Sequence, residues 1–143
     1  MEILLREVHH DDAEQVLLLC KQLGYEISAN ALKRNIEILN NENDNGVFVA
    51  EYERTVIGWI GVAYVLTIQS LPFCEVRGLV VDEKFRNKNI GKLLVEKAAA
   101  WCKEKACNTL RVRCNVKRER IHSFYGHLGF TEKKEQKIFE INV

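Results

Sequence analysis

The chain lacks the features that define several large protein classes. It contains a single proline, Pro72, and no apolar run in its 143 residues approaches the roughly 18 that a membrane-spanning helix needs. Its formal net charge is +1, so no overall field attracts nucleic acid or an acidic membrane. Residues 1–6 lack the basic region and apolar segment that begin a signal peptide. We therefore expect a cytoplasmic protein without nucleic-acid or membrane partners.

The cysteines and histidines form no familiar metal or disulfide pattern. Five cysteines are an odd number and include no Cys-x-x-Cys pair, so neither a disulfide framework nor a zinc site is predicted. His9 and His10 are adjacent in a strand-to-helix loop, where we expect the two side chains to point apart. No third ligand is evident beside them. We predict that the protein holds no metal.

Residues 75–94 predict a strand, a polar loop and a helix in close succession. Apolar and β-branched residues run to Val81, and Asp82 ends the run, which is typical of a strand. Apolar residues then recur at the three- and four-residue spacing of a helix, at Ile90, Leu93, Leu94, Ala98 and Trp101.

The loop between this strand and helix favours an anion. It contains Arg86, Lys88 and Lys92, with no acidic residue after Glu83. The first N–H groups of a helix have no intrahelical acceptor, and the helix dipole places about half a positive charge there, which suits a phosphate. Neither a P-loop nor a Gly-x-Gly-x-x-Gly motif occurs. We expect Asn89 to adopt a tight or left-handed conformation, which asparagine tolerates.

Two segments resemble the signatures of the GNAT superfamily of N-acetyltransferases. Residues 80–91 are similar to its acetyl-CoA-binding segment, usually Arg/Gln-x-x-Gly-x-Gly/Ala: Arg86 and Gly91 match, and Asn89 replaces the first glycine. Residues 115–130 resemble the second signature, which closes in Phe-Tyr-x-x-x-Gly-Phe, here from Phe124 to Phe130. The Asn89 variant followed by Asn-Val-Lys-Arg is similar to a subgroup that includes aminoalkylphosphonate acetyltransferases. The resemblance extends over nearly the whole chain.

The pattern of elements predicts one α/β domain over residues 1–143. We expect strands at 2–8, 47–52, 56–68, 75–81, 109–114 and 138–143, with a hairpin joining the second and third. Helices are expected after an Asp11–Glu14 capping box and after Ser28, and then at 89–105 and 120–128. The resemblance implies a mixed, mostly antiparallel sheet with about four flanking helices. This sheet would splay open between the strands ending at Val81 and Cys114 to admit coenzyme A.

The resemblance also implies acetyl-CoA as the cosubstrate and a primary amine as the acceptor. The cofactor contacts would come from Leu79, Val80, Val81, Arg86, Asn87, Lys88, Asn89, Ile90, Gly91, Lys92, Asn115, Arg118 and Tyr125. Peptide groups of Leu79 and Val81 would pair with the pantetheine arm like an added strand. Arg118 would approach a coenzyme A phosphate or simply cover the surface.

Three residues are candidates for catalysis. The Leu79 N–H could stabilise the oxyanion, because Gly78 before it suggests a bulge, although Gly78 could instead make room for an aromatic ring. Tyr125 matches the tyrosine that in the family faces the coenzyme sulfur, whereas its helical spacing alone would suit a core residue. Glu75 is either the base that deprotonates the amine or a carboxylate that is solvated or paired with Arg77. A chain of water molecules could serve as the base instead.

Three functions are compatible with these residues. The first is an N-acetyltransferase that acts on a small-molecule amine by direct attack in a ternary complex. The second is acetylation of a protein or peptide, and the third is a coenzyme A-binding module without catalysis. An acetyl-enzyme on Cys74 is disfavoured because no histidine in the pattern would activate its thiol. A homodimer is possible, since dimers are common in the family.

Overall fold

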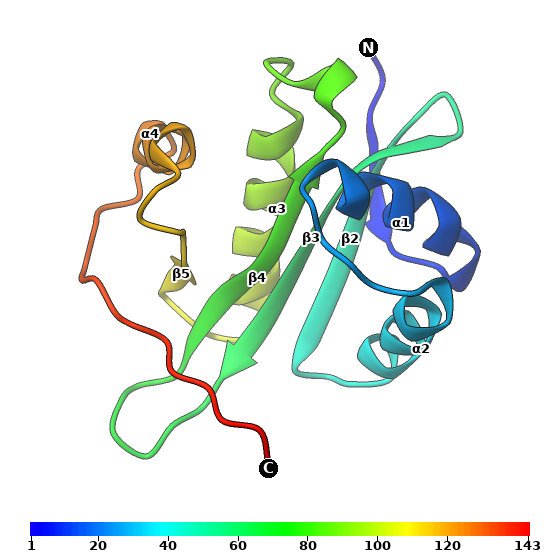
Figure 1. The fold of residues 1–143 in the computed structure, drawn as a ribbon. Coiled ribbons are helices and arrows are strands. Elements are labelled where there is room, and N and C mark those ends of the chain that lie inside the picture. Colours follow the sequence, from blue (N-terminus) through cyan, green and yellow to red (C-terminus); the bar gives the residue numbers. More distant parts are fainter. The chain divides into compact units, whose positions relative to one another are not determined.

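The structure, a computed structural model, describes residues 1–143 and forms two compact units, residues 1–112 and 113–143. The first unit is built on a five-stranded sheet in the order β1-β2-β3-β4-β5 (Figure 1). Its strands are β1 (Leu4–Glu7), β2 (Asn45–Tyr52), β3 (Thr55–Val65), β4 (Phe73–Val81) and β5 (Leu110–Val112). Its helices are α1 (Ala13–Gln22), α2 (Ala29–Asn40) and α3 (Ile90–Glu104), with short 3₁₀ turns η1 (His10–Asp12) and η2 (Glu83–Phe85).

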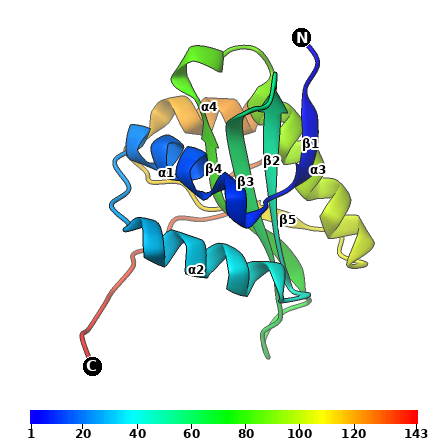
Figure 2. The ribbon, with the colours of Figure 1, turned by 90° about the vertical axis from the view of Figure 1, so that its right-hand side faces the viewer.

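Helices cover both faces of the sheet in the first unit (Figure 2). Val16 of α1 and Leu32 of α2 belong to one buried cluster with Val49 and Val80 of the sheet. On the other face α3 packs so closely that a Cβ on Gly58 would lie 3.1 Å from a Leu94 methyl group. The sheet is therefore the middle of three layers, and its interior strands are apolar on both faces.

The sheet is mixed, as expected. β1 to β4 pair antiparallel, and β4 and β5 pair in parallel. The β2–β3 hairpin turns at Glu53 and Arg54, whose φ angles of 47° and 65° are those of a type I′ turn. β3 ends at Val65, three residues earlier than Ile68, and β5 is shorter than the strand expected at 109–114.

The first two helices have defined caps, and the cap expected at Ser28 is confirmed. Gly24, at φ 80°, ends α1, and the Tyr25 N–H donates to the Cys20 carbonyl as in a Schellman motif. The Ser28 hydroxyl accepts the Ala31 N–H and caps α2. The capping box predicted for Asp11 and Glu14 is wrong. It lies two residues earlier, because the chain first forms η1, capped by His9 with Asp12 as the returning side chain.

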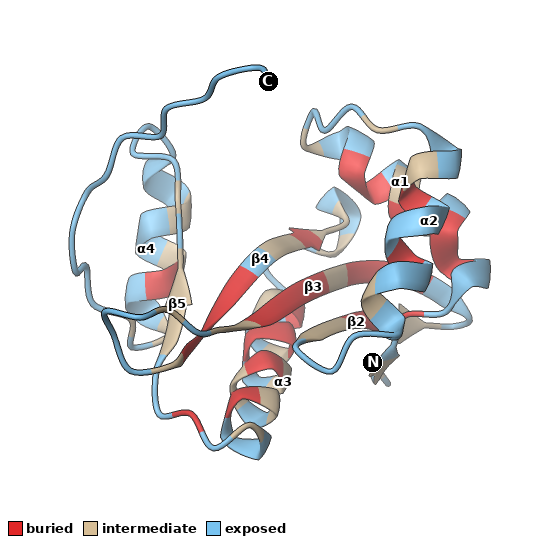
Figure 3. Ribbon diagram, turned by 90° about the horizontal axis from the view of Figure 1, so that it is seen from below, coloured by how far each residue is buried: buried red, intermediate tan, exposed pale blue.

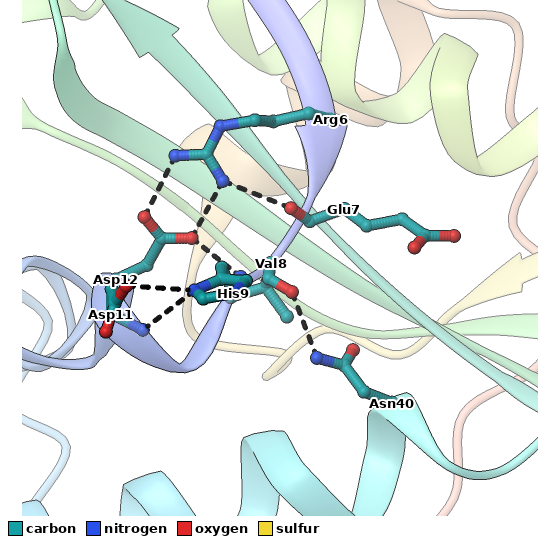
Figure 4. A pocket seen from close by; sticks show the side chains of 7 residues that line it. All are labelled: Arg6, Glu7, Val8, His9, Asp11, Asp12 and Asn40. Atoms are coloured by element: carbon teal, nitrogen blue, oxygen red, sulfur yellow. Dashed lines mark hydrogen bonds and ion pairs between the residues drawn. The ribbon is translucent and has the colours of Figure 1, made fainter.

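Asp12 also joins β1 to the start of α1. Figure 4 shows the Arg6 guanidinium facing the Asp12 carboxylate, which it contacts at 2.8 and 2.9 Å, while the His9 N–H donates to the same carboxylate at 2.7 Å. Arg6 donates to Glu51 of β2 as well. Burial would raise the pKa of Asp12, but Arg6 and the His9 N–H hold that pKa below its ordinary value. Arg6, His9 and Asp12 line a surface hollow. We call the Arg6–Asp12–Glu51 cluster the clasp, because it links β1, β2 and the start of α1.

The second unit contains one helix, α4 (Glu119–His127). Gly129 follows it at φ 93°, and the Phe130 N–H donates to the Tyr125 carbonyl, so α4 ends in a Schellman motif. The strand predicted at 138–143 is wrong, since these residues have no regular secondary structure. Alternation specifies which side chains share a face, but a strand also needs a partner edge. Ile138, Phe139, Ile141 and Val143 are instead exposed.

None of the four α-helices has both the length and the apolar character that crossing a membrane requires. The prediction of a single domain, like that of a homodimer, stays a prediction.

We expect Asp12→Asn to lower the free energy of unfolding by about 2 kcal/mol at pH 7, because it removes charged hydrogen bonds from a buried carboxylate. Since the folded-state pKa is depressed, the stabilisation is present above the ordinary pKa of about 3.9 and is lost as the pH falls through the folded-state value. The difference between wild type and variant should therefore shrink from pH 6 to pH 2 in urea titrations. The exposed neighbour Asp11→Asn is the matched control; an equal loss in both variants would contradict the clasp.

Candidate active site

An extra residue in β4 creates one of the two register shifts of the sheet. β3 and β4 pair with Gly61 opposite Gly78 and Val62 opposite Val76, so that Arg77 has no partner of its own. This is a β-bulge, in which two residues of one strand oppose one of the other. The bulge expected from Gly78 is confirmed, with Arg77 as the inserted residue.

The bulge reverses the direction of the peptide groups in β4. Before it, the Cys74 N–H donates to Thr109 on the β5 side at 2.9 Å; after it, the Asp82 N–H donates to Ile57 of β3 at 2.8 Å. Because alternate residues direct their peptide groups to opposite neighbours, Leu79 and Val81 direct theirs away from β3. β5 pairs with β4 only from Cys74 to Val76. The peptide groups of Leu79 and Val81 therefore lie at an edge without a partner strand.

Gly78 also makes room for an aromatic ring. A Cβ at this position would lie 2.5 Å from a carbon of the Trp59 indole, closer than real Cβ contacts allow. The two explanations of Gly78, a bulge and a packed aromatic, thus both hold. Val80 differs from its neighbours, because its peptide group faces β3 and its side chain, 1% exposed, belongs to the core under α1 and α2. It offers nothing to the open edge.

The chain passes from this edge through η2 to the start of α3, and α3 has no side-chain cap at its N-terminus. The first α3 bond runs from the Leu93 N–H to the Asn89 carbonyl, and the Asn89 side chain caps no N–H group. Asn89 has φ 64° and ψ 15°, which confirms the predicted left-handed conformation. The N–H groups of the next three residues, Ile90, Gly91 and Lys92, precede the helix ladder. They form the kind of site that binds a phosphate.

The side chains around this helix start are mostly exposed. They are Arg86, Asn87, Lys88, Asn89 and Lys92, and Asn87 is also left-handed, at φ 63°. Ile90 differs, because its side chain is 1% exposed and packs in the core, so only its N–H is available to a ligand.

Glu75 lies on the opposite face of β4 from the side chains of Leu79 and Val81. Without the bulge these residues would share a face, but the extra residue changes the alternation. The Glu75 side chain is 3% exposed, and its carboxylate lies 3.0 Å from the Arg77 guanidinium, which is largely exposed. The expected Arg77 pair is therefore present, and a solvated Glu75 is excluded.

The other three expected site residues belong to the second unit. Tyr125 of α4 is 7% exposed, with its ring edge-on to those of Phe124 and Phe130 at 5.0 and 5.3 Å. The Asn115 side chain accepts the Lys117 N–H in a turn, beyond the end of β5. Arg118 is exposed and lies at the N-cap of α4.

Cys74 does not have the environment of a nucleophile. It is fully buried, and burial, together with the neighbouring thiols of Cys102 and Cys107, raises its pKa. The thiolate is the nucleophilic form, so this thiol is held in its unreactive state. Its backbone neighbour Glu75 faces the other side of the sheet.

His9 and His10 lie closer together than we expected. Their ring centroids are 4.6 Å apart, and the Asp11 carboxylate contacts both rings, at 3.3 and 3.0 Å. The expectation that the two side chains point apart is wrong, because η1 turns the chain at this point. His9 Nδ1 accepts the Asp11 N–H, so its lone pair serves the cap of η1. All three residues are exposed.

Sequence reasoning named Phe73 only as one of several aromatics that could shape the acceptor pocket, and it missed Arg111 and the contact between the two. Arg111 of β5 is the direct partner of Glu75 in the parallel pair, and its guanidinium lies 3.9 Å above the Phe73 ring centroid. Neither residue belongs to a motif. Only the β4–β5 register brings them together, and the sequence does not specify that register.

The first unit has a mixed sheet between two layers of helices. Its fourth strand bulges and then leads through a basic loop to a helix without a side-chain cap. This arrangement defines the GNAT fold. The acetyltransferase (GNAT) family model matches residues 10–130, and the chain belongs to this family.

Two curated relatives are N-acetyltransferases that are themselves named as uncharacterized. The one from Chlorobaculum tepidum is 40% identical over 89 residues, 62% of this chain and 54% of that protein. The one from Methanocaldococcus jannaschii is 27% identical over 98 residues, 67% of this chain and 43% of that protein. The chain thus spans about half the length of these relatives.

Solved structures support the fold. The aminoglycoside N-acetyltransferase AAC(6')-Iy, in complex with a bisubstrate analogue of coenzyme A, superimposes with a TM-score of 0.88 at 20% identity, over 100% of both chains.

We expect acetyl-CoA binding to depend on the left-handed residue at the start of α3. Asn89→Gly should leave the dissociation constant within about twofold, because glycine adopts positive φ freely. Asn89→Val should weaken binding about tenfold, since a β-branched residue pays about 1–2 kcal/mol in this conformation and a relaxed loop would redirect the amides. Calorimetric titration with acetyl-CoA distinguishes the two variants. Equal affinity for Asn89→Val and wild type would show that these amides do not hold the ligand.

Proposed function

We propose that the protein transfers the acetyl group of acetyl-CoA to a primary amine by direct attack in a ternary complex. One observation carries this proposal: the bulge at Arg77 leaves the peptide groups of Leu79 and Val81 at an open edge, on the strand that leads to the uncapped start of α3. An extended pantetheine arm can pair with such an edge, and a diphosphate suits such a helix start. Membership of the GNAT family supports the same cosubstrate.

The acetyl transfer needs three things from the protein. An alkylamine has a pKa of about 10, so freeing its lone pair at pH 7 costs roughly 4 kcal/mol. The tetrahedral intermediate needs a donor for its oxyanion, and the Leu79 N–H is such a donor because it has no strand partner. The departing thiolate needs a proton or a hydrogen bond.

Tyr125 is the proposed general acid for that thiolate. The proposal rests on its match to the Phe-Tyr-x-x-x-Gly-Phe signature and on the aromatic contacts that fix its ring. A phenol has a pKa of about 10 and a thiol one of about 8.5, so a free thiolate is a weaker base than a phenolate. With these pKa values the phenol stabilises the departing thiolate by donating a hydrogen bond, and complete proton transfer is uphill. Asn115 and Arg118, from the same signature, are proposed to contact the cofactor.

Glu75 is the proposed base that deprotonates the amine, directly or through water. A carboxylate that is almost fully buried is uncommon, and Glu75 is buried beside the exposed Arg77 guanidinium. Its side chain lies on the face opposite α3, whereas the Leu79 peptide group lies in the plane of the sheet at the edge. The amine and the thioester can thus approach from different sides.

The acceptor is proposed to be a small molecule. AAC(6')-Iy, which shares the fold, carries the name of an aminoglycoside acetyltransferase, and its ligand joins coenzyme A to an acetylneamine. Residues 86–91 and 115–118 resemble aminoalkylphosphonate acetyltransferases, so aminoalkylphosphonates are the first acceptors to test.

A thiol-release assay with a panel of amines tests the function. We expect coenzyme A release with at least one small amine, and we expect Tyr125→Phe to lower kcat about 100-fold, at the lower end for a lost acid, while the acetyl-CoA dissociation constant changes less than twofold. Tyr52→Phe, which loses a hydroxyl on the β2–β3 hairpin, is the control. Release with peptides alone would indicate protein acetylation, and binding without release for any amine would indicate a silent module.

The pH profile of Glu75→Gln tests the base. Without a carboxylate, turnover would depend on the free amine, whose fraction rises tenfold per pH unit up to about pH 10. We therefore expect kcat/KM of the variant to fall about 100-fold at pH 7 and to keep rising with pH where the wild-type value is level. Glu96→Gln, on the exposed side of α3, should match wild type. Profiles of the same shape for Glu75→Gln and wild type would exclude this role.

A further inference from the structure

Arg111 belongs to the same face of the sheet as the proposed base. It is the direct partner of Glu75 between β5 and β4, and paired residues of neighbouring strands project from the same face. Phe73, two residues before Glu75 in β4, projects from this face too. The buried core under α1 and α2 does not include these three residues, and Figure 3 shows those helices over the opposite part of the sheet.

The Arg111 guanidinium is held in place without an acidic partner. It stacks on the Phe73 ring at 3.9 Å, and Phe73 itself is 5% exposed, so the ring is a fixed platform. The Arg111 Nε atom is buried and donates no hydrogen bond. A buried donor without an acceptor is costly, and a stacked guanidinium has its donors already oriented.

The acidic residue opposite Arg111 in the neighbouring strand is already engaged. The Glu75 carboxylate pairs with Arg77 at 3.0 Å, and Arg111 forms no ion pair. The formal charges of Arg77, Glu75 and Arg111 sum to +1, so the Glu75 carboxylate does not neutralise both guanidinium groups. A planar guanidinium binds carboxylate and phosphate groups through two parallel hydrogen bonds.

We propose that Arg111 binds an anionic group on the acceptor, so that the substrate is a short amine that also carries a phosphonate, phosphate or carboxylate. This inference rests on the proposed function. Glu75 and Arg111 are partners on neighbouring strands, whose backbones lie about 4.8 Å apart, so one short molecule could place an amine at Glu75 and an anion at Arg111. Phe73 is the positioning residue that fixes the guanidinium.

Steady-state kinetics with acceptors of matched length test this inference at saturating acetyl-CoA. The acceptors are 2-aminoethylphosphonate, β-alanine and the neutral propylamine. We expect wild type to favour the anionic acceptors in kcat/KM, and Arg111→Met to raise their KM about tenfold or more while kcat changes less than twofold. Propylamine should be unaffected. Arg111→Lys keeps the charge but loses the two parallel hydrogen bonds, so its KM for the anionic acceptors should lie between those of wild type and Arg111→Met. Arg34→Met, on the exposed side of α2, should match wild type.

The two anionic acceptors identify the source of the negative charge: a larger Arg111→Met effect on the phosphonate indicates a phosphonate or phosphate group, and a larger effect on β-alanine a carboxylate. Equal losses for anionic and neutral acceptors, or a wild type that prefers propylamine, would overturn the inference and leave the acetyltransferase proposal intact. If no amine releases coenzyme A, the proposed function fails, and calorimetric titration of 2-aminoethylphosphonate into wild type and Arg111→Lys decides the anion site separately. Equal or undetectable binding in both would overturn it.

Discussion

One inserted residue, Arg77, determines the geometry on which the rest of the site depends. A regular β4 would leave the Leu79 and Val81 peptide groups facing β3, where ladder hydrogen bonds would occupy them. The bulge turns them to the edge and at the same time moves the Glu75 side chain to the other face. A single backbone irregularity thus separates the proposed cofactor edge from the proposed acceptor face. Gly78, beside it, permits both the bulge and the close approach of Trp59.

The charged groups around β4 fall into two regions. The loop before α3 has exposed cations and N–H groups that precede the helix ladder, which suits a diphosphate. On the opposite face of β4 and β5, the buried Glu75 forms an ion pair with Arg77, and Arg111, its partner in β5, stacks on Phe73. Because the cysteine cluster behind β4 is buried and its Cys74 pKa is raised, a covalent thiol route has no support.

The parts of this arrangement that depend on the conformation of single residues could be predicted from the sequence. Asn89 had to be left-handed because it replaces a glycine, and Gly78 inside a strand indicated a bulge. Interactions that depend on register or on a partner were not accessible. The Glu75–Arg111 pairing follows from how β5 aligns on β4, and the alternation at 138–143 predicted a strand for a segment that pairs with none. The capping box moved because η1 competes with α1 for the same residues.

Amide hydrogen exchange of β4 tests the account most directly, because the bulge gives neighbouring residues opposite behaviour. Without ligand, the Val80 amide should exchange slowly and those of Leu79 and Val81 quickly. Saturating acetyl-CoA should slow Leu79 and Val81 by about tenfold or more, as new hydrogen bonds to charged or carbonyl groups form, and leave Val80 unchanged. Protection of all three amides without ligand, or no change at Leu79 and Val81 on adding acetyl-CoA, would contradict the open edge as the cofactor site.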